Sequence, residues 1–201
     1  MEDLTTYTLV GSLTVTSSKV SGFFPGNVDR YLYKDFGANY FDGIKLNFEG
    51  SIDDSDPYGY TSNIYVGFSD VVDDATGWGS DRLTVRFARY GTYGTGTYCI
   101  KLNYFASFDT YYIDPDTTYY LTLSRSPGGD TATLKIYSDA ARTTLLDTLT
   151  VSGIGTTKWQ YFFAASTCND SEVNHEAYGF MQNFLFGGAI AGQVRVIGMM
   201  L

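Results

Sequence analysis

Apolar and polar residues alternate along short stretches of the chain, and turn residues separate these stretches. In residues 119–151, Leu121 and Leu123 alternate with threonine and serine, and after a Pro-Gly-Gly-Asp turn Leu134 and Ile136 continue the alternation. A period of two is typical of a strand that buries one face, and a glycine turn between two such runs predicts a hairpin. The pattern therefore predicts β-structure, and no long segment keeps a helical period.

Candidate strands recur every ten to fifteen residues along the chain. They are residues 4–10, 12–20, 30–35, 43–52, 62–69, 82–90, 97–105, 118–125, 131–138, 145–151, 158–166 and 178–187. Short strands at this spacing predict a sandwich or a barrel. We expect an all-β, two-sheet antiparallel β-sandwich formed by residues 1–188 as one domain, followed by an apolar segment, residues 189–201.

Composition agrees with this prediction. The chain has 18 Tyr and 14 Phe, and these residue types fit a pleated, half-buried surface. Of the 22 acidic residues only four are Glu, a helix former, and the rest are Asp, which favours turns. The composition indicates many strands joined by many turns.

Charge excludes several classes of partner. The formal net charge is −9 and the sequence pI is about 4.4, so we expect no nucleic-acid binding, which needs a basic patch. The sequence contains no run of about 18 apolar residues, so it predicts no membrane-spanning helix. The N-terminal sequence MEDLTTYTLV is acidic and lacks the apolar core of a secretory signal. We therefore expect no membrane insertion.

Cysteine and histidine are scarce. Cys99 and Cys168 are the only cysteines, and we expect two free thiols, with a single long-range bridge as the alternative. His175 is the only histidine, which excludes metal sites with several histidines. We expect His175 to be an exposed or capping side chain.

Four stretches carry a resemblance to a known family. They are YLYKDFGANYFDGIKLNFEGSI (31–52), TTYYLTLSRSPGGDTATLKIYSDAARTTLLDTLTV (117–151), WQYFFAASTCND (159–170) and YGFMQNFLFGG (178–188). In this order they resemble the concanavalin A-like, laminin-G-like jelly-roll domains found in many phage-encoded and metagenomic proteins. The resemblance implies two antiparallel sheets of about six strands each, a fold that hosts lectins, hydrolases, adhesion modules and capsid accessories.

The acidic pattern of a glycoside hydrolase is incomplete. Hydrolases of this fold carry acidic residues that alternate along one inner strand and point into one cleft. Here Glu49 and Asp53 share a face of one strand, but the middle acid is missing, and Glu172 and Glu176 lie in a loop. We predict that the protein is not an enzyme.

One acidic cluster has the composition of a calcium loop. Asp53, Asp54 and Asp56 fall within four residues, and calcium takes about six to eight oxygen ligands from such loops. No EF-hand spacing is present, and the aspartates also suit solvated turns. We expect that no cofactor is required and that calcium is the metal that this cluster could bind.

The aromatic residues divide into two groups. Those in apolar runs are expected in the core: Phe23, Phe24, Phe36, Phe41, Phe87, Phe162 and Phe184. Those beside glycines in predicted loops could present a ring to a sugar or to a partner protein: Tyr58, Tyr60, Trp78, Tyr90 and Tyr93. The alternative is that these loop rings fold back over the sandwich.

The C-terminal segment AIAGQVRVIGMML contains a single charge. It either forms a last strand or binds a partner through Val194, Val196, Ile197 and Met200, since an exposed apolar strand is poorly tolerated in water. The partner would be a second copy of this chain or another protein of a particle.

These observations favour a non-enzymatic structural or binding module. We interpret it as an accessory protein of a phage virion, such as a capsid decoration, a head fibre or a tail-associated domain, with a surface that could bind glycans. The alternative is an extracellular, lectin-like carbohydrate-binding domain, secreted or detached from a larger protein. A glycoside hydrolase of the same fold is the less favoured alternative.

Overall fold

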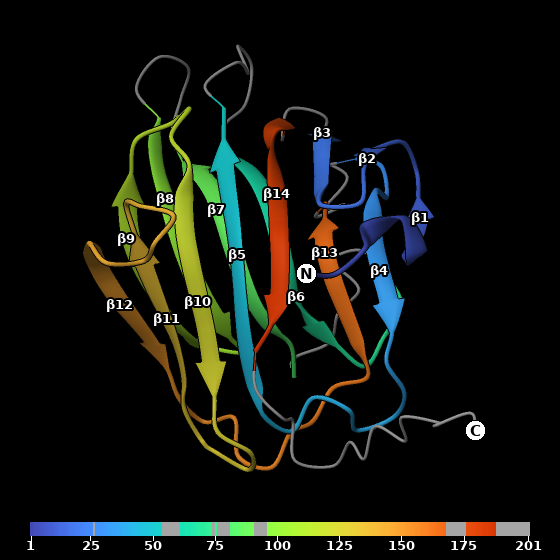
Figure 1. Cartoon of the computed structure of the whole chain (residues 1–201), viewed down its shortest axis with the longest axis vertical. Helices are drawn as coiled ribbons and strands as arrows, with labels where there is room; N and C mark the ends of the chain where they lie inside the picture. Colours follow the sequence, from blue (N-terminus) through green and yellow to red (C-terminus); the bar gives the residue numbers. More distant parts are fainter. Residues whose placement is uncertain are drawn as a thin grey trace, which may run out of the picture.

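The structure is a computed structural model that describes residues 1–25, 27–53, 61–73, 75, 81–90, 96–167 and 176–187 (Figure 1). Within these residues the chain forms one short 3₁₀ helix, η1 (Leu4–Thr6), and fourteen strands. The strands are β1 (Thr8–Val10), β2 (Thr14–Val15), β3 (Lys19–Pro25), β4 (Tyr31–Asp35), β5 (Ile44–Ile52), β6 (Thr61–Ser69), β7 (Leu83–Tyr90), β8 (Thr97–Tyr104), β9 (Ser107–Ile113), β10 (Tyr119–Arg125), β11 (Ala132–Tyr137), β12 (Leu145–Val151), β13 (Tyr161–Ser166) and β14 (Glu176–Phe186).

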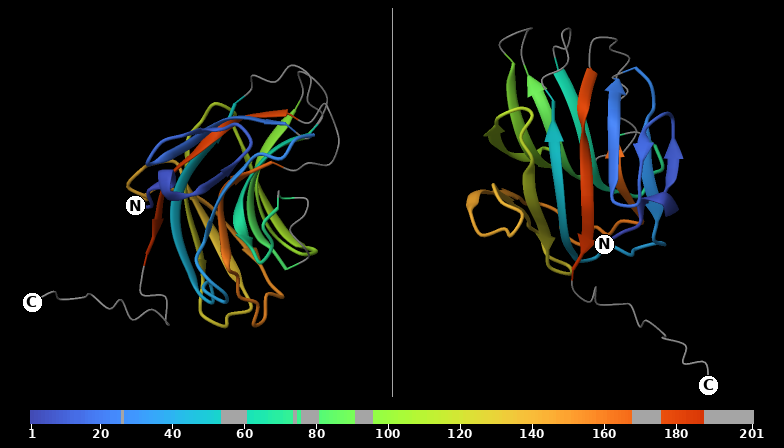
Figure 2. Two further views of the ribbon diagram at one scale, coloured as in Figure 1. Left: turned by 90° about the vertical axis from the view of Figure 1, so that its right-hand side faces the viewer. Right: turned by 45° about the horizontal axis from the view of Figure 1, so that its top comes forward.

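Two antiparallel sheets of seven strands stack face to face. Sheet A has the order β1-β4-β13-β6-β7-β8-β9, and sheet B has the order β12-β11-β10-β5-β14-β3-β2. In Figure 1 sheet B lies in front of sheet A, and the side view in Figure 2 shows the two layers. The predicted all-β, two-sheet antiparallel sandwich is confirmed, with seven strands in each described sheet where the resemblance implied about six.

The alternation along β5 builds the core of sheet B. Ile44, Leu46 and Phe48 are buried between the sheets, whereas the residues between them point outward. Gly50 continues the inward row because no side chain fits there: a Cβ would lie 2.5 Å from Met181 Sδ and 2.9 Å from the Phe87 ring. Close approach of the two sheets at this point therefore requires glycine.

The predicted hairpin is formed by β10 and β11. Leu121 pairs with Ile136 and Leu123 with Leu134, and all four side chains are fully buried. Arg125 ends the inward row with a charge. Its guanidinium donates to the carbonyls of Gly129, Thr157 and Gly155 at 2.6 to 2.9 Å. The buried cation is hydrogen-bonded, as a buried charge must be.

Three local predictions were wrong. Residues 4–6 form a 3₁₀ turn instead of a strand, because the Asp3 carboxylate accepts from the Thr5 amide and hydroxyl. Residues 12–20 are not one strand, since the chain reverses between Thr16 and Lys19. Strand β9 was missed because its apolar side chains do not alternate with polar ones: Phe108 and Tyr112 are exposed at the edge of sheet A.

The aromatic core is largely as predicted. Phe24, Phe41, Phe87, Phe162 and Phe184 are buried between the sheets. Phe36 packs against this core while only partly buried. Phe23 is a correction, because it lies on the outward side of β3 and stacks on Tyr178 with 4.9 Å between ring centres.

Candidate functional site

The face of sheet A that points away from sheet B has an unusual composition. Along β7, Leu83, Val85 and Phe87 point into the core, so the residues between them point outward. We call this surface the outer face of sheet A. On its central and β9 side it comprises Asn63, Tyr65, Thr84, Arg86, Ala88, Tyr90, Cys99, Lys101, Asn103, Phe108, Thr110 and Tyr112. Four of these, Tyr65, Thr84, Ala88 and Cys99, are buried, so the accessible part of this face lies around Arg86, Lys101 and the β9 side chains.

A second apolar cluster covers the other half of this face. Tyr31, Tyr65, Ala75 and Phe163 are buried, and Tyr33 stacks on Phe163 with 5.6 Å between ring centres. Ala75 donates its amide to the Thr167 carbonyl at 3.0 Å, so the chain at Ala75 lies against the sheet. This half of the outer face is therefore an apolar cluster of packed aromatic side chains and not a polar surface in contact with water.

Two cations stand side by side next to this cluster. Arg86 on β7 pairs in register with Lys101 on β8. The Arg86 guanidinium carbon lies 5.5 Å from the centre of the Tyr65 ring and 5.1 Å from that of Tyr90, and its Nη2 donates to the Tyr90 hydroxyl. Lys101 Nζ lies 3.7 Å from the centre of the Phe108 ring. Each cation is thus in contact with an aromatic face.

The electrostatics of the pair are unfavourable. Burial lowers the pKa of Lys101, and the positive charge of Arg86 lowers it further. Among the described residues, neither cation forms an ion pair with a carboxylate. Burial also raises the pKa of the Tyr90 hydroxyl, against the opposing effect of Arg86. The site therefore has positive charge, aromatic rings and a hydroxyl in one place.

Of the predicted binding residues, the structure describes only Tyr90. It is the last residue of β7, not a loop residue, and lies half-buried on the outer face of sheet A. Tyr58, Tyr60, Trp78 and Tyr93 lie outside the described residues. The strand ends that flank residues 54–60 and 91–95 are neighbours, however, because Thr61 pairs with Tyr90.

Sequence reasoning missed Arg86 and Lys101. Both residues occupy polar positions in the alternating patterns of β7 and β8. An arginine or a lysine between apolar residues is, however, typical of any strand face in contact with water. A signal existed in the pattern of residues 97–104, where Lys101 is the only charge. The pattern could not show that a second cation would stand opposite it.

The predicted metal cluster is described only at Asp53. Burial raises the pKa of the Asp53 carboxyl, and the nearby charge of Asp116 raises it further. Asp54 and Asp56 lie outside the described residues, and no group of three metal-binding side chains occurs among the residues searched. Two neighbouring carboxylates alone do not meet the ligand number of calcium.

Glu49 lies on the outward side of β5, in the opposite sheet. Its Oε2 accepts from Gln182 Nε2 at 2.8 Å and from Asn183 Nδ2 at 2.9 Å. A carboxylate held by two amides in this way serves the packing of β5 against β14. Glu172 lies outside the described residues, and Glu176, which was predicted in a loop, is the first residue of β14, paired with Pro25 of β3.

Cys99 is a buried free thiol on the outer face of sheet A, and burial raises its pKa. Cys168 and His175 lie outside the described residues. The tail residues Val194, Val196, Ile197 and Met200 do so too, and their partner-binding role stays a prediction. No helix in the described part of the chain is long and apolar enough to cross a membrane.

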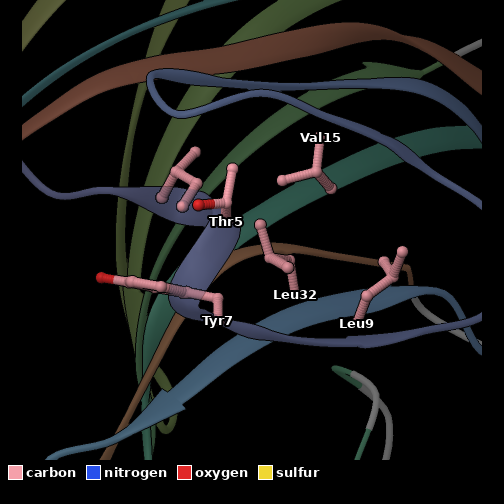
Figure 3. A pocket seen from close by; sticks show the side chains of 6 residues that line it. Thr5, Tyr7, Leu9, Val15 and Leu32 are labelled. Atoms are coloured by element: carbon pink, nitrogen blue, oxygen red, sulfur yellow. The ribbon is translucent and has the colours of Figure 1, made fainter.

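An apolar hollow of about 250 Å³ opens at one edge of the sandwich, between β1 and β2 (Figure 3). It is lined by Leu4, Thr5, Tyr7, Leu9, Val15 and Leu32. The Thr5 hydroxyl already donates to Asp3, and the Tyr7 hydroxyl donates to Glu2. The hollow offers no charged side chain to orient a ligand, so the outer face of sheet A is the better candidate site.

The sequence matches no protein-family model and no curated protein. The structure, in contrast, is similar to solved lectins. The VIP36 exoplasmic/lumenal domain, solved with Ca²⁺ and Man3GlcNAc bound, is 12% identical, with 94% of this chain and 89% of that chain covered and a TM-score of 0.57. Winged bean acidic lectin, complexed with methyl-α-D-galactose, is 8% identical, with 92% and 95% covered and a TM-score of 0.53.

A third similar structure is the legume lectin-like domain from Entamoeba histolytica. It is 10% identical, 90% of each chain is covered, and the TM-score is 0.52. At such low identity these similarities establish the fold alone. The chain has a legume-lectin-like, concanavalin A-like β-sandwich fold.

Proposed function

We propose that this protein is a lectin-like carbohydrate-binding protein without catalytic activity, and that the outer face of sheet A is its binding surface. The observation that carries the proposal is the grouping of Arg86, Lys101 and aromatic rings on one face of a lectin-like sandwich. Aromatic rings offer flat apolar contact to the C–H face of a sugar, and charged or polar groups at their edges bind its oxygens.

Exposed rings extend this surface to the edge of the sheet. On β9, Phe108 is 61% exposed and Tyr112 is 69% exposed. Large exposed aromatic side chains are unfavourable in water and are typical of interaction surfaces. In the sequence, the predicted loop rings Tyr58, Tyr60 and Tyr93 adjoin the paired strand ends Thr61 and Tyr90, whereas Trp78 falls in the connection at the opposite ends of β6 and β7. Their part in binding stays a prediction.

An array of labelled oligosaccharides tests the proposal. Binding is measured for the wild-type protein, for the double variant Phe108→Ala/Tyr112→Ala, and for Tyr178→Ala, a control on the outward side of sheet B. We expect the double variant to lose about tenfold in affinity and the control to bind like the wild type. If the wild type binds no oligosaccharide, or if the double variant binds equally well, the proposal is wrong.

The comparison with VIP36 raises the question of a calcium site. VIP36 was solved with Ca²⁺ bound, but the described residues fit such a site poorly, since they bring together only the Asp53 and Asp116 carboxylates. We therefore assign calcium no step in binding. Repeating the array in the presence of a chelator tests this assignment, and a loss of binding would contradict it.

The virion interpretation stays a prediction. The lectin-like neighbours favour the alternative interpretation, a carbohydrate-binding domain, and none of the three described above is a virion protein. The VIP36 neighbour is an exoplasmic/lumenal domain, and an extracellular location suits a glycan-binding protein in the same way. The absence of enzymatic activity is likewise a proposal, tested by incubating the protein with polysaccharides and measuring reducing ends.

A further inference from the structure

We infer that the outer face of sheet A binds a negatively charged saccharide, and that Arg86 and Lys101 together hold the carboxylate or sulfate group of one of its sugars. The inference rests on the proposed function and specifies the class of its ligand. Its support comes from three independent features of the face: the pairing of like charges, the polar atoms without partners, and the arrangement of the rings.

The pairing of like charges is costly in the free protein. Arg86 and Lys101 stand directly opposite each other on adjacent antiparallel strands, where the Cβ atoms of facing residues lie about 4.5 to 5.5 Å apart. Like charges in such positions destabilise a sheet. The nearest acidic residue along β9, Asp109, points to the other side and accepts from the Thr150 amide at 3.0 Å. An anion bound between the two cations would remove this cost.

Two polar atoms on the same face are buried without a hydrogen-bond partner in the described structure. They are Arg86 Nε, a donor, and Asn63 Oδ1, an acceptor. Asn63 lies on β6 opposite Ala88, which is two positions along β7 from Arg86 and on the same face. Buried polar atoms without partners are rare in folded proteins and call for an explanation. Both atoms are shielded from solvent, so they mark an incompletely satisfied polar environment beside Arg86. The ligand itself would contact the accessible part of the Arg86 side chain, with an anionic oxygen as the acceptor.

The rings flank the cations along the sheet. Tyr65 and Tyr90 lie against Arg86, and Phe108 lies against Lys101. The distance from β6 to β9 is three interstrand spacings, about 14 Å. A ligand that contacts both ends of this row is therefore an oligosaccharide. The rings also favour a saccharide over a simple anion as the ligand, because a small anion would contact only the two cations and leave the rings without a role in binding.

The net charge of −9 limits the reach of this attraction. The overall charge repels anionic chains, but ions screen charges beyond a Debye length, about 8 Å at physiological ionic strength. Attraction then comes only from cations in contact with the ligand. We therefore expect the affinity for the anionic saccharide to fall as the salt concentration rises above physiological ionic strength.

Calorimetry with a defined ligand pair tests the inference. The anionic probe is an oligogalacturonate, its neutral counterpart is the fully methyl-esterified form, and a sulfated oligosaccharide of similar length separates carboxylate from sulfate recognition. The protein variants are Lys101→Met, Lys101→Arg and Lys135→Met. Lys135 is an exposed lysine on a strand of sheet B and serves as the matched control. Methionine keeps the apolar stem over Phe108 while it removes the charge.

We expect the wild type to bind at least one of the two anionic probes, and Lys101→Met to lose about tenfold or more of that affinity. Lys101→Arg should retain it, and Lys135→Met should not change it. Lys101→Met should also keep or raise the melting temperature, because it removes the like-charge repulsion. Loss of affinity without loss of stability distinguishes a ligand contact from a structural role.

The outcomes separate the inference from the proposed function. If the methyl ester binds as well as both anionic probes, the inference fails while carbohydrate binding stands. If Lys135→Met weakens binding as much as Lys101→Met, the attraction is non-specific and the inference fails. If an oligoglutamate peptide competes as well as the saccharides, the face recognises acidic chains in general and the saccharide assignment is wrong. If no saccharide binds, both fail.

Discussion

The guanidinium carbon of Arg125 lies 5.1 Å from the centre of the Trp159 ring, and both side chains are buried. Arg125 also donates to three backbone carbonyls of the loops that follow β10 and β12. A single buried cation thus joins one hairpin turn to the segment that leads into β13. The contact explains a charge at an inward position of the otherwise apolar hairpin.

We predict that Arg125→Met destabilises the protein by about 3 kcal/mol, because three partly buried carbonyls lose a charged donor. The midpoint of urea unfolding measures the change. Lys135→Met, which removes an exposed charge from the neighbouring strand, is the control and should change stability by less than about 0.5 kcal/mol. Equal midpoints for the two variants would contradict a structural role for Arg125.

Core truncations should be costly at the centre of sheet B. Leu134 and Phe48 are fully buried, so Leu134→Ala and Phe48→Ala should each lower the free energy of unfolding by about 2 to 5 kcal/mol. Leu145→Ala removes the same atoms as Leu134→Ala from a side chain that is 51% exposed, and it should cost much less. A thermal melt unchanged by either core truncation would show that the assigned strand facing is wrong.

The turn after β11 should give the protein an acid-sensitive contribution to stability. The Asp139 carboxylate accepts from the amides of Thr144 and Thr143, and these bonds lower the pKa of Asp139 from 3.8 to about 2. A depressed folded-state pKa stabilises the fold above the unfolded-state value, and this stabilisation is lost as the pH falls from about 4 to about 2. The difference in unfolding midpoint between wild type and Asp139→Asn should therefore shrink over this range. A difference that stays constant from pH 7 to pH 2 would exclude the carboxylate as its cause.

The C-terminal segment leads to a prediction about assembly. We expect deletion of residues 190–201 to abolish association, with itself or with a partner, while the melting temperature stays unchanged, because a partner strand would satisfy and bury the apolar segment. Light scattering and a thermal melt on the truncated and full-length proteins test this expectation. A full-length protein that stays monodisperse at high concentration, together with a truncated protein that unfolds, would show instead that the segment belongs to the core.

Local pattern was enough to determine the fold class and most strands. Leu121, Leu123, Leu134 and Ile136 alternate with polar residues, and such an alternation can bury one face only as a strand. The turn glycines and the many aspartates end these strands. Strand β9 escaped prediction because an edge strand has less need to bury either face, so Phe108 and Tyr112 broke the alternation.

The candidate site was decided by the tertiary structure. The sequence of β13 lies more than 90 residues from that of β6, yet Phe162 pairs with Phe68 and brings the aromatic cluster beside Arg86. The alternation along β7 separates two sets of side chains, but it does not say which strand of the sheet lies next to which. Register across β6, β7 and β8 placed Tyr65, Arg86 and Lys101 in one row. Such neighbours are set by backbone pairing and by core packing over the whole sandwich, because the residues on an outer face do not themselves determine how the strands pair.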